Sequence, residues 1–169
     1  VEEAIRFIRK TKEHISLELI KKIHKVVFKN SKSFAGKFRK KGEEVVILAK
    51  DGTIIDEGAP QSRIKHLLKD LINWYKNNKN KYPGIVLAAI IHNQFENIHP
   101  FADGNGRVGR ILLNNILLKH KLPPLNIQLK NRSEYYLTIR EYSQNQNIKP
   151  TLDLFLKEYK QLKKELQKK

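Results

Sequence analysis

The chain has 169 residues, of which 40% are hydrophobic, which fits one domain with a substantial core and excludes an intrinsically disordered chain. It has 34 Lys and Arg against 17 Asp and Glu, hence a net charge of +17, and it has no cysteine. Disulfides and thiolate chemistry are therefore excluded, and a reducing, cytoplasmic location is expected.

The longest apolar run, Ile85–Ile91, is too short to cross a bilayer, and no signal-peptide pattern opens the chain. We therefore expect no membrane association. Position 1 is Val and the chain contains no Met, so we expect a fragment of a longer protein.

The basic charge is typical of a surface that binds nucleic acid or acidic lipid. The lysines are nevertheless spread over the whole chain and mix with acidic residues, and only Lys157–Lys169 is densely basic. We expect a solvated basic surface that also attracts an anionic nucleotide, with nucleic acid unlikely as a partner. A basic nucleic-acid-binding module without enzymatic activity remains the alternative.

Apolar spacing predicts helices through most of the first half of the chain. Val1–Lys12 has apolar residues on one face, and Ser16 is a suitable N-cap for a second helix that contains His24 within its apolar stripe. After a basic loop, two short β-branched runs flank Asp51-Gly52, which predicts a hairpin over about residues 44–58.

The second half is predicted to be helical as well. Ser62–Lys76 is amphipathic, and Ile85–Phe95 is apolar nearly all round, which indicates a buried central helix. Further helices are expected at Ile111–Leu118, after an N-cap at Ser133, and after a cap at Thr151, where a basic helix would run over about residues 151–169. The prediction is an all-α bundle of about seven or eight helices with a small β-hairpin, forming one domain over residues 1–169.

The stretch His99–Arg110, HPFADGNGRVGR, concentrates the residues that can carry chemistry. Gly104-Asn105-Gly106 can adopt positive φ at several positions, so its backbone N–H groups can converge on an anion. The following helix would point its N-terminus at the same place. Such a loop favours a polyphosphate ligand.

Charged side chains flank this glycine turn. Arg107 and Arg110 are three residues apart, so on a helix they share a face. Their two guanidinium groups can each donate paired hydrogen bonds to phosphate oxygens. Asp103 is placed to hold Mg²⁺, which prefers oxygen ligands and bridges phosphates. His99, on the other side of the loop, is a candidate general base, because its ordinary pKa leaves it largely neutral near pH 7.

The same stretch resembles the signature of the Fic (Fic/Doc) family, His-Pro-Phe-x-(Asp/Glu)-Gly-Asn-Gly-Arg-x-x-Arg, at every specified position. Most members of that family are AMP transferases, so the resemblance implies a Fic-like helical bundle and a protein adenylyltransferase. It implies Mg²⁺ as cofactor and ATP as substrate. It also implies a target protein, or the enzyme itself, as acceptor, and a homo-oligomer is possible.

Three other segments resemble parts of Fic domains. Gly36–Arg39 resembles the Gly-x-Phe-Arg segment, and the predicted hairpin stands where the family has a flap that aligns the target over the active site. The run Arg132–Tyr136 resembles the segment whose tyrosine lies near the adenine, which points to Tyr136 as a nucleotide contact. His92 matches a helical histidine of the family, for which we expect a structural role.

Fic enzymes are commonly inhibited by a helix carrying (Ser/Thr)-x-x-x-Glu-(Gly/Asn). Thr53–Gly58 matches this string, but it lies inside the predicted hairpin, so we interpret it as a chance match. The resemblance instead suggests the class whose inhibitory helix precedes the catalytic domain.

The expected reaction transfers AMP from Mg-ATP to a Ser, Thr or Tyr hydroxyl, with His99 as base. The expected nucleotide contacts are Gly104, Asn105, Gly106, Arg107, Arg110 and Tyr136, and the expected metal ligand is Asp103. Two enzymatic alternatives use the same site: transfer of another nucleotide or a phosphoryl group, and removal of AMP from a modified protein.

Overall fold

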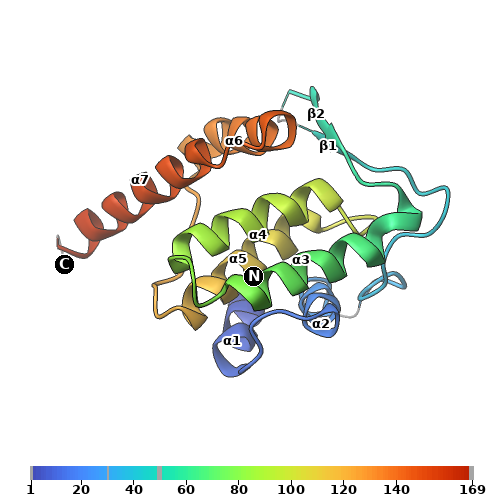
Figure 1. The fold of residues 1–169 in the computed structure, drawn as a ribbon, viewed down its shortest axis with the longest axis horizontal. Coiled ribbons are helices and arrows are strands. Elements are labelled where there is room, and N and C mark those ends of the chain that lie inside the picture. Colours follow the sequence, from blue (N-terminus) through green and yellow to red (C-terminus); the bar gives the residue numbers. More distant parts are fainter. Residues whose placement is uncertain (1, 30, 49–50, 168–169) are drawn as a thin grey trace.

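The structure is a computed structural model that describes residues 2–29, 31–48 and 51–167. This part of the chain contains seven α-helices and one two-stranded antiparallel sheet, which confirms the predicted all-α bundle with a hairpin (Figure 1). The elements are α1 (Glu2–Lys10), α2 (Leu17–Val27), β1 (Val46–Leu48), β2 (Ile54–Glu57), α3 (Ile64–Asn78), α4 (Gly84–Ile98), α5 (Asn105–Lys119), α6 (Arg132–Asn145) and α7 (Lys149–Leu166).

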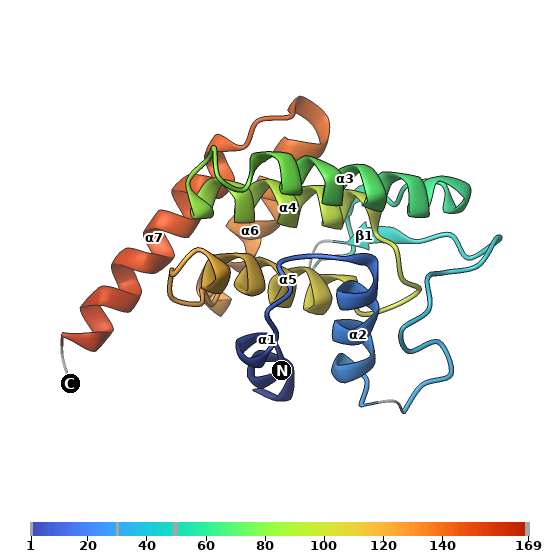
Figure 2. The same ribbon diagram turned by 60° about the horizontal axis from the view of Figure 1, so that its bottom comes forward.

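Helices α4 and α5 form the centre of the bundle (Figures 1 and 2). Helix α4 packs on α3, α5, α6 and α7, while α5 packs on α1, α2 and α4. The predicted burial of α4 is confirmed, because its apolar residues surround the helix and nine of its fifteen residues are buried. The loop between these two helices is therefore fixed at both ends in the most buried part of the molecule.

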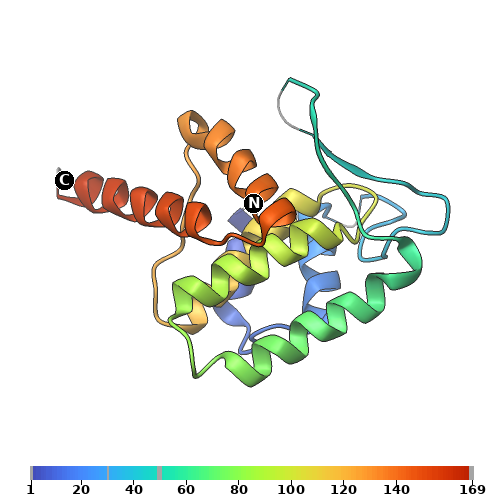
Figure 3. The ribbon, with the colours of Figure 1, turned by 45° about the horizontal axis from the view of Figure 1, so that its top comes forward.

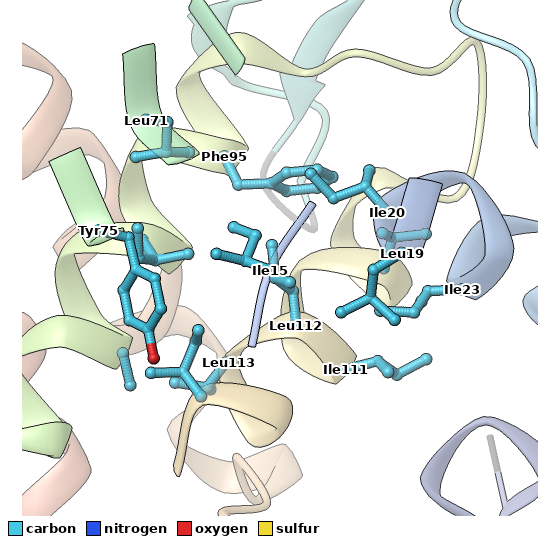
Figure 4. Packing of buried hydrophobic residues seen from close by; sticks show 14 of the residues in the cluster. Ile15, Leu19, Ile20, Ile23, Leu71, Tyr75, Phe95, Ile111, Leu112 and Leu113 are labelled. Carbon is cyan, nitrogen blue, oxygen red and sulfur yellow. The ribbon is translucent and has the colours of Figure 1, made fainter. Parts of the chain in front are cut away.

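The core is continuous from the N-terminal to the C-terminal helices. Side chains from α2, α3, α4 and α5 converge in Figure 4, among them Ile20, Leu71, Phe95 and Leu112. Ala4 of α1 and Phe155 of α7 belong to the same cluster and are almost completely buried. This packing is what a single domain requires.

Helix boundaries confirm one predicted cap and correct two others. Ser16 caps α2, because its hydroxyl accepts the Leu19 N–H at 3.0 Å. Ser133 was wrong as an N-cap, since α6 begins at Arg132 after Asn131. Thr151 was also wrong: Ile148 precedes α7, and the Thr151 hydroxyl instead accepts a hydrogen bond from Asn93 on α4 at 3.0 Å. The Thr151 hydroxyl therefore serves a contact between helices and does not cap its own helix.

The hairpin projects from the helices as a ribbon (Figure 3), with its ends anchored below the loop between α4 and α5. Val46 pairs with Glu57 and Ile47 with Asp56, followed by a bulge. The string Thr53–Gly58 includes strand β2, so it forms no helix, as predicted. Among the described residues, no helix is both long and apolar enough to cross a membrane.

Candidate active site

His99 ends helix α4 in a left-handed conformation, with φ 50° and ψ 60°. Such a conformation is uncommon for a residue with a side chain and needs support from its surroundings. Support comes from the Arg39 Nε–H, which donates to the His99 carbonyl at 2.9 Å. The left-handed turn reverses the chain and sends the following residues back toward α5.

The imidazole of His99 is held in one tautomer. Its Nδ1 lies 3.1 Å from the Glu96 carbonyl oxygen, which can only accept, so Nδ1 carries the hydrogen and Nε2 keeps its lone pair. Burial lowers the pKa of His99 below its ordinary value. Both effects favour a neutral ring whose Nε2 can take a proton, which is what a general base needs.

Arg39 joins the hairpin to this histidine. Its side chain is 2% exposed and donates to three backbone carbonyls, those of His99, Glu43 and Ala59. Its own backbone N–H donates to Pro100 at 3.0 Å. The Gly-x-Phe-Arg segment was predicted only by resemblance, and the chemical role of its arginine was missed. A long side chain with five donors can tie together segments far apart in sequence.

Phe101 anchors the middle of the loop. Its ring is fully buried and stacks on the His24 ring, with centroids 3.8 Å apart and an interplanar angle of 11°. His24 accepts the Gly36 N–H at Nδ1, so its Nε2–H donates to the Asp103 carbonyl at 3.0 Å. His24 is thus a buried histidine whose two ring nitrogens both form hydrogen bonds inside the protein.

The glycine turn differs from the prediction. Helix α5 begins at Asn105, ahead of the apolar run Ile111–Leu118 from which it was predicted, and Gly104 is the residue of the turn with positive φ, at 81°. Gly106 and Arg107 therefore lie in the first helical turn, where backbone N–H groups have no partner within the helix. Of the two features predicted to attract an anion, the helix N-terminus is present, whereas the nest with several positive-φ residues is not formed.

The side chain of Asn105 faces inward. It is 2% exposed, donates to the Phe101 carbonyl at 2.7 Å and accepts the Phe101 N–H at 2.9 Å. A side chain so occupied cannot also bind a ligand, so Asn105 can offer only its backbone N–H to a phosphate. The prediction that Asn105 contacts the nucleotide therefore now applies only to the backbone N–H of Asn105.

One cavity of about 460 Å³ gathers all eight predicted site residues. Its wall is formed by His99, Ala102, the loop and helix residues 103–107, Arg110, Arg132, Tyr136 and the hairpin residues 44–46. Arg107 lies over the Phe28 ring, 4.5 Å from its centroid, and its guanidinium is 3.4 Å from the Asp103 carboxylate. The cavity therefore combines one histidine, two carboxylates (Glu44 and Asp103), three arginines and a helix N-terminus.

Asp103 can hold a divalent cation only together with a ligand that supplies further oxygens. Its carboxylate is 62% exposed, and the described residues contain no group of three or more His, Cys, Asp or Glu side chains suited to a metal. Mg²⁺ commonly takes one or two carboxylates, substrate phosphates and water. The residues present fit that kind of site.

The two adjacent tyrosines of α6 have different surroundings. Tyr135 is buried, and its hydroxyl pairs with His92 Nε2 at 2.9 Å. Tyr136 lines the cavity, and the Arg132 side chain donates to its hydroxyl at 3.3 Å. The structure thus places Tyr136 on the wall of the cavity. His92 lies in the core and holds the neighbouring Tyr135. Burial lowers the pKa of His92 to about 4. Sequence reasoning missed Arg132 as a cavity residue.

The matched family model is described as Fic/DOC family and covers residues 14–117. The chain is 44% identical over 82 residues to a protein of Aquifex aeolicus named "Probable protein adenylyltransferase", covering 48% of this chain and 25% of that one. It is 32% identical over 146 residues to "Protein adenylyltransferase fic-1" of Caenorhabditis briggsae, covering 82% of this chain and 27% of that protein.

Solved structures agree with these sequence matches. The fold matches Fic-1 of C. elegans with a TM-score of 0.76 at 29% identity, over 93% of this chain and 46% of that chain. It matches a Fic family protein of Desulfovibrio desulfuricans with a TM-score of 0.76 at 26% identity, over 90% and 47%. The chain spans about a quarter of the two curated relatives' length. By sequence signature, family model and fold, the chain belongs to the Fic/DOC family.

Proposed function

We propose that this chain is the catalytic domain, over residues 1–169, of a protein adenylyltransferase that moves AMP from Mg-ATP to a Ser, Thr or Tyr hydroxyl. The observation that carries the proposal is the single cavity in which His99 Nε2 has its lone pair available near the N-terminus of α5. Similarity to proteins named adenylyltransferase supports it.

The phosphates of ATP would bind at the first turn of α5. Backbone N–H groups of Asn105 and Gly106 and the helix dipole favour negative charge there. The Gly104 N–H donates to the Asp103 carboxylate at 2.5 Å and would join them once that carboxylate binds the metal. Arg107 and Arg110 add charge-assisted hydrogen bonds to the outer phosphates. Mg²⁺ held by Asp103 and the phosphates would neutralise charge on the departing pyrophosphate. Tyr136 offers a ring near the cavity for the base.

The reaction is an in-line displacement at the α-phosphorus. The target hydroxyl loses its proton to His99 Nε2 as its oxygen bonds to phosphorus, and the bond to the β-phosphate oxygen breaks to release pyrophosphate. General-base assistance of this kind is worth about 10² to 10⁴ in rate. The arginines stabilise the charge that builds on the leaving group.

The hairpin is proposed to present the target. Its residues 44–46 line the cavity, and Val46, Leu48 and Ile54 expose large apolar side chains. An exposed strand edge can pair with an extended segment of another protein, or of a second copy of this chain. We propose a cytoplasmic setting for this reaction, consistent with a chain that lacks cysteine.

The test uses ATP labelled at either the α- or the γ-phosphate, incubated with the protein, Mg²⁺ and candidate targets. Label transferred only from the α-phosphate supports AMP transfer, and label from the γ-phosphate would support phosphorylation instead. A pre-modified target that loses AMP would support the reverse activity. Absence of label with every target, together with tight nucleic-acid binding at physiological salt, would favour the non-enzymatic module.

His99→Ala is the matched control. We expect it to lower AMP transfer by at least about 10²-fold and to leave ATP affinity unchanged in calorimetry, because the base contacts the acceptor and not the phosphates. Undiminished transfer by this variant would contradict the role of His99.

A further inference from the structure

Glu96 is a buried carboxyl directly behind the proposed base. It lies three residues before His99 on the last turn of α4 and is 2% exposed. Its Oε2 is 4.0 Å from His99 Nδ1, and its Oε1 has no hydrogen-bond partner among the described residues. Acidic side chains are rarely buried without a partner, so this carboxyl needs an explanation.

A notch in helix α5 holds the carboxyl. A Cβ atom at Gly109 would lie 2.1 Å from Glu96 Oε1, so a side chain at position 109 would displace it. Gly109 is one of the unspecified positions of the signature, between Arg107 and Arg110. The absence of a side chain there makes room for the carboxyl of Glu96.

The charged and titratable groups around Glu96 come from three helices. His99 and His92 share α4 with it, Arg110 of α5 exerts a favourable charge on its ionised form, and Tyr135 of α6 is also within electrostatic reach. Burial outweighs Arg110 and raises the pKa of Glu96 to about 7. The carboxyl can thus change charge within the range in which enzymes operate.

We propose that Glu96 is a positioning residue that, when ionised, stabilises the imidazolium of His99 formed during transfer. The inference rests on the proposed function. When the target hydroxyl gives its proton to Nε2, positive charge spreads to Nδ1, 4.0 Å from the carboxylate. An opposite charge at this distance stabilises the protonated ring, more strongly in a buried site than in water.

The first experiment measures AMP transfer by wild type and Glu96→Gln at pH 6 and pH 8. The variant keeps the shape of the side chain but cannot ionise. Near pH 6 Glu96 is mostly protonated, so the two proteins should differ by less than about threefold; at pH 8 wild type should be about ten- to a hundredfold faster in kcat. KM for ATP should change little. An equal ratio at both pH values would overturn the proposal, because a merely structural defect acts at every pH.

Two further variants separate this role from general damage. Gly109→Ala should lose the same pH-dependent advantage, because its methyl group displaces the carboxyl. Glu158→Gln alters another buried glutamate, on α7, whose Oε1 accepts from Asn131 at 2.8 Å. It should lower stability while leaving the ratio between pH 6 and pH 8 as in wild type. Full retention of that ratio in a folded Gly109→Ala protein would contradict the inference.

A second readout does not depend on catalysis. NMR titration follows the histidine Cε1–H signals, with His99 assigned by its loss in His99→Ala. In wild type the His99 signal should show a second inflection near pH 7, where Glu96 ionises beside it, and Glu96→Gln should lack this inflection. The same curve in both proteins would overturn the inference. If wild type transfers no label at any pH, the proposed function fails, and this titration still decides whether Glu96 acts on His99.

Discussion

At the scale of single residues, the loop of the site is fixed by side chains that never face the cavity. Asn105 closes a ring of two hydrogen bonds on the backbone of Phe101, and His24 holds the Asp103 carbonyl. These contacts leave the cavity to backbone N–H groups and charged side chains. A binding site built in this way is preorganised, because its backbone is already ordered before the ligand arrives.

Asn105→Ala tests this support. The substitution leaves the buried N–H and carbonyl of Phe101 without partners, and we expect the free energy of unfolding to fall by about 2 kcal/mol. Urea denaturation measures the loss. Asn145→Ala, on the exposed face of α6, removes only a hydrogen bond to Glu141 and should stay within about 0.5 kcal/mol of wild type. A similar loss in both variants would argue against a special role for Asn105.

Glu96 also predicts how stability depends on pH. Its pKa rises from 4.5 to about 7 on folding, so the folded state binds the proton more tightly than the unfolded state. The associated stability is present below pH 4.5 and is lost as the pH rises through 7, by up to about 3 kcal/mol. Glu96→Gln removes this dependence and should therefore be more stable than wild type at pH 8.

Paired urea titrations of wild type and Glu96→Gln at pH 5 and pH 8 isolate the effect of Glu96. His92 opposes it, because its lowered pKa costs stability as the pH falls, but both proteins contain His92. If the free energy of unfolding of wild type instead rose relative to that of Glu96→Gln between pH 5 and pH 8, the result would contradict the raised pKa of Glu96.

At the scale of elements, the hairpin is fastened at its base and along its second strand. Arg39 holds its two ends, and the Ser143 hydroxyl of α6 donates to the Asp56 carboxylate of β2. Helix α6 also carries Tyr136 into the cavity. The position of β2 and the position of Tyr136 are therefore set by the same helix.

Ser143→Ala should loosen β2. The loss of one hydrogen bond to a charged group predicts a decrease of about 1 to 2 kcal/mol in the free energy of local opening. Amide hydrogen exchange of Ile54–Glu57 should accelerate by about tenfold, while exchange in α4 stays unchanged. Ser133→Ala, near the start of α6, is the matched control and should leave exchange in β2 as it is. Unaltered exchange in Ser143→Ala would show that other contacts hold the strand.

The sequence predicted which helices and strands exist more accurately than the residues at which they begin and end. Apolar spacing located the helices, and Asp51-Gly52 located the hairpin, because both patterns are local. The glycines of the signature predict a turn through Gly106, but α5 already begins at Asn105, because the packing of Val108 and Gly109 against α4 favours a helix. Thr151 was misassigned because its partner, Asn93, is 58 residues away.

The same limit applies to the site. The signature predicted that His99, Asp103 and both arginines form one site, because their residue types and spacing suit phosphate chemistry, and the structure places all four on the wall of one cavity. Arg39 contacts a residue 60 positions away in the chain, and no local sequence pattern marks such a contact. Glu96 is close to His99 in sequence, but no local pattern shows that its side chain is turned into the core. Arg39 could have been found only through the resemblance of Gly36–Arg39 to the family.

At the scale of the whole molecule, part of the net charge of +17 comes from a group of lysines on and beside α7. A groove along α7 is lined by four lysines, Lys130, Lys157, Lys160 and Lys164, whereas the cavity with His99 lies between the hairpin, α5 and α6. The two surfaces share no lining residue. Charge on α7 can therefore be changed without altering the residues that line the cavity.

This separation predicts that nucleic-acid affinity and AMP transfer respond to different changes. Replacing Lys157, Lys160 and Lys164 by Gln should weaken binding of a fluorescent oligonucleotide and reduce the slope of log affinity against log salt by about 2 to 3. The rate of AMP transfer should remain within about twofold. Loss of transfer in step with oligonucleotide binding would mean that α7 takes part in the reaction.

The three carbonyls gathered by Arg39 have a consequence for engineering. Because the arginine holds the hairpin by its ends, the segment between residues 46 and 57 is joined to the catalytic loop through main-chain atoms, whatever side chains it carries. Hairpins from other members of the family could be grafted onto this frame with the base undisturbed. Under the proposed function, in which the hairpin presents the acceptor, chimeras that exchange only this ribbon would redirect modification to a chosen protein.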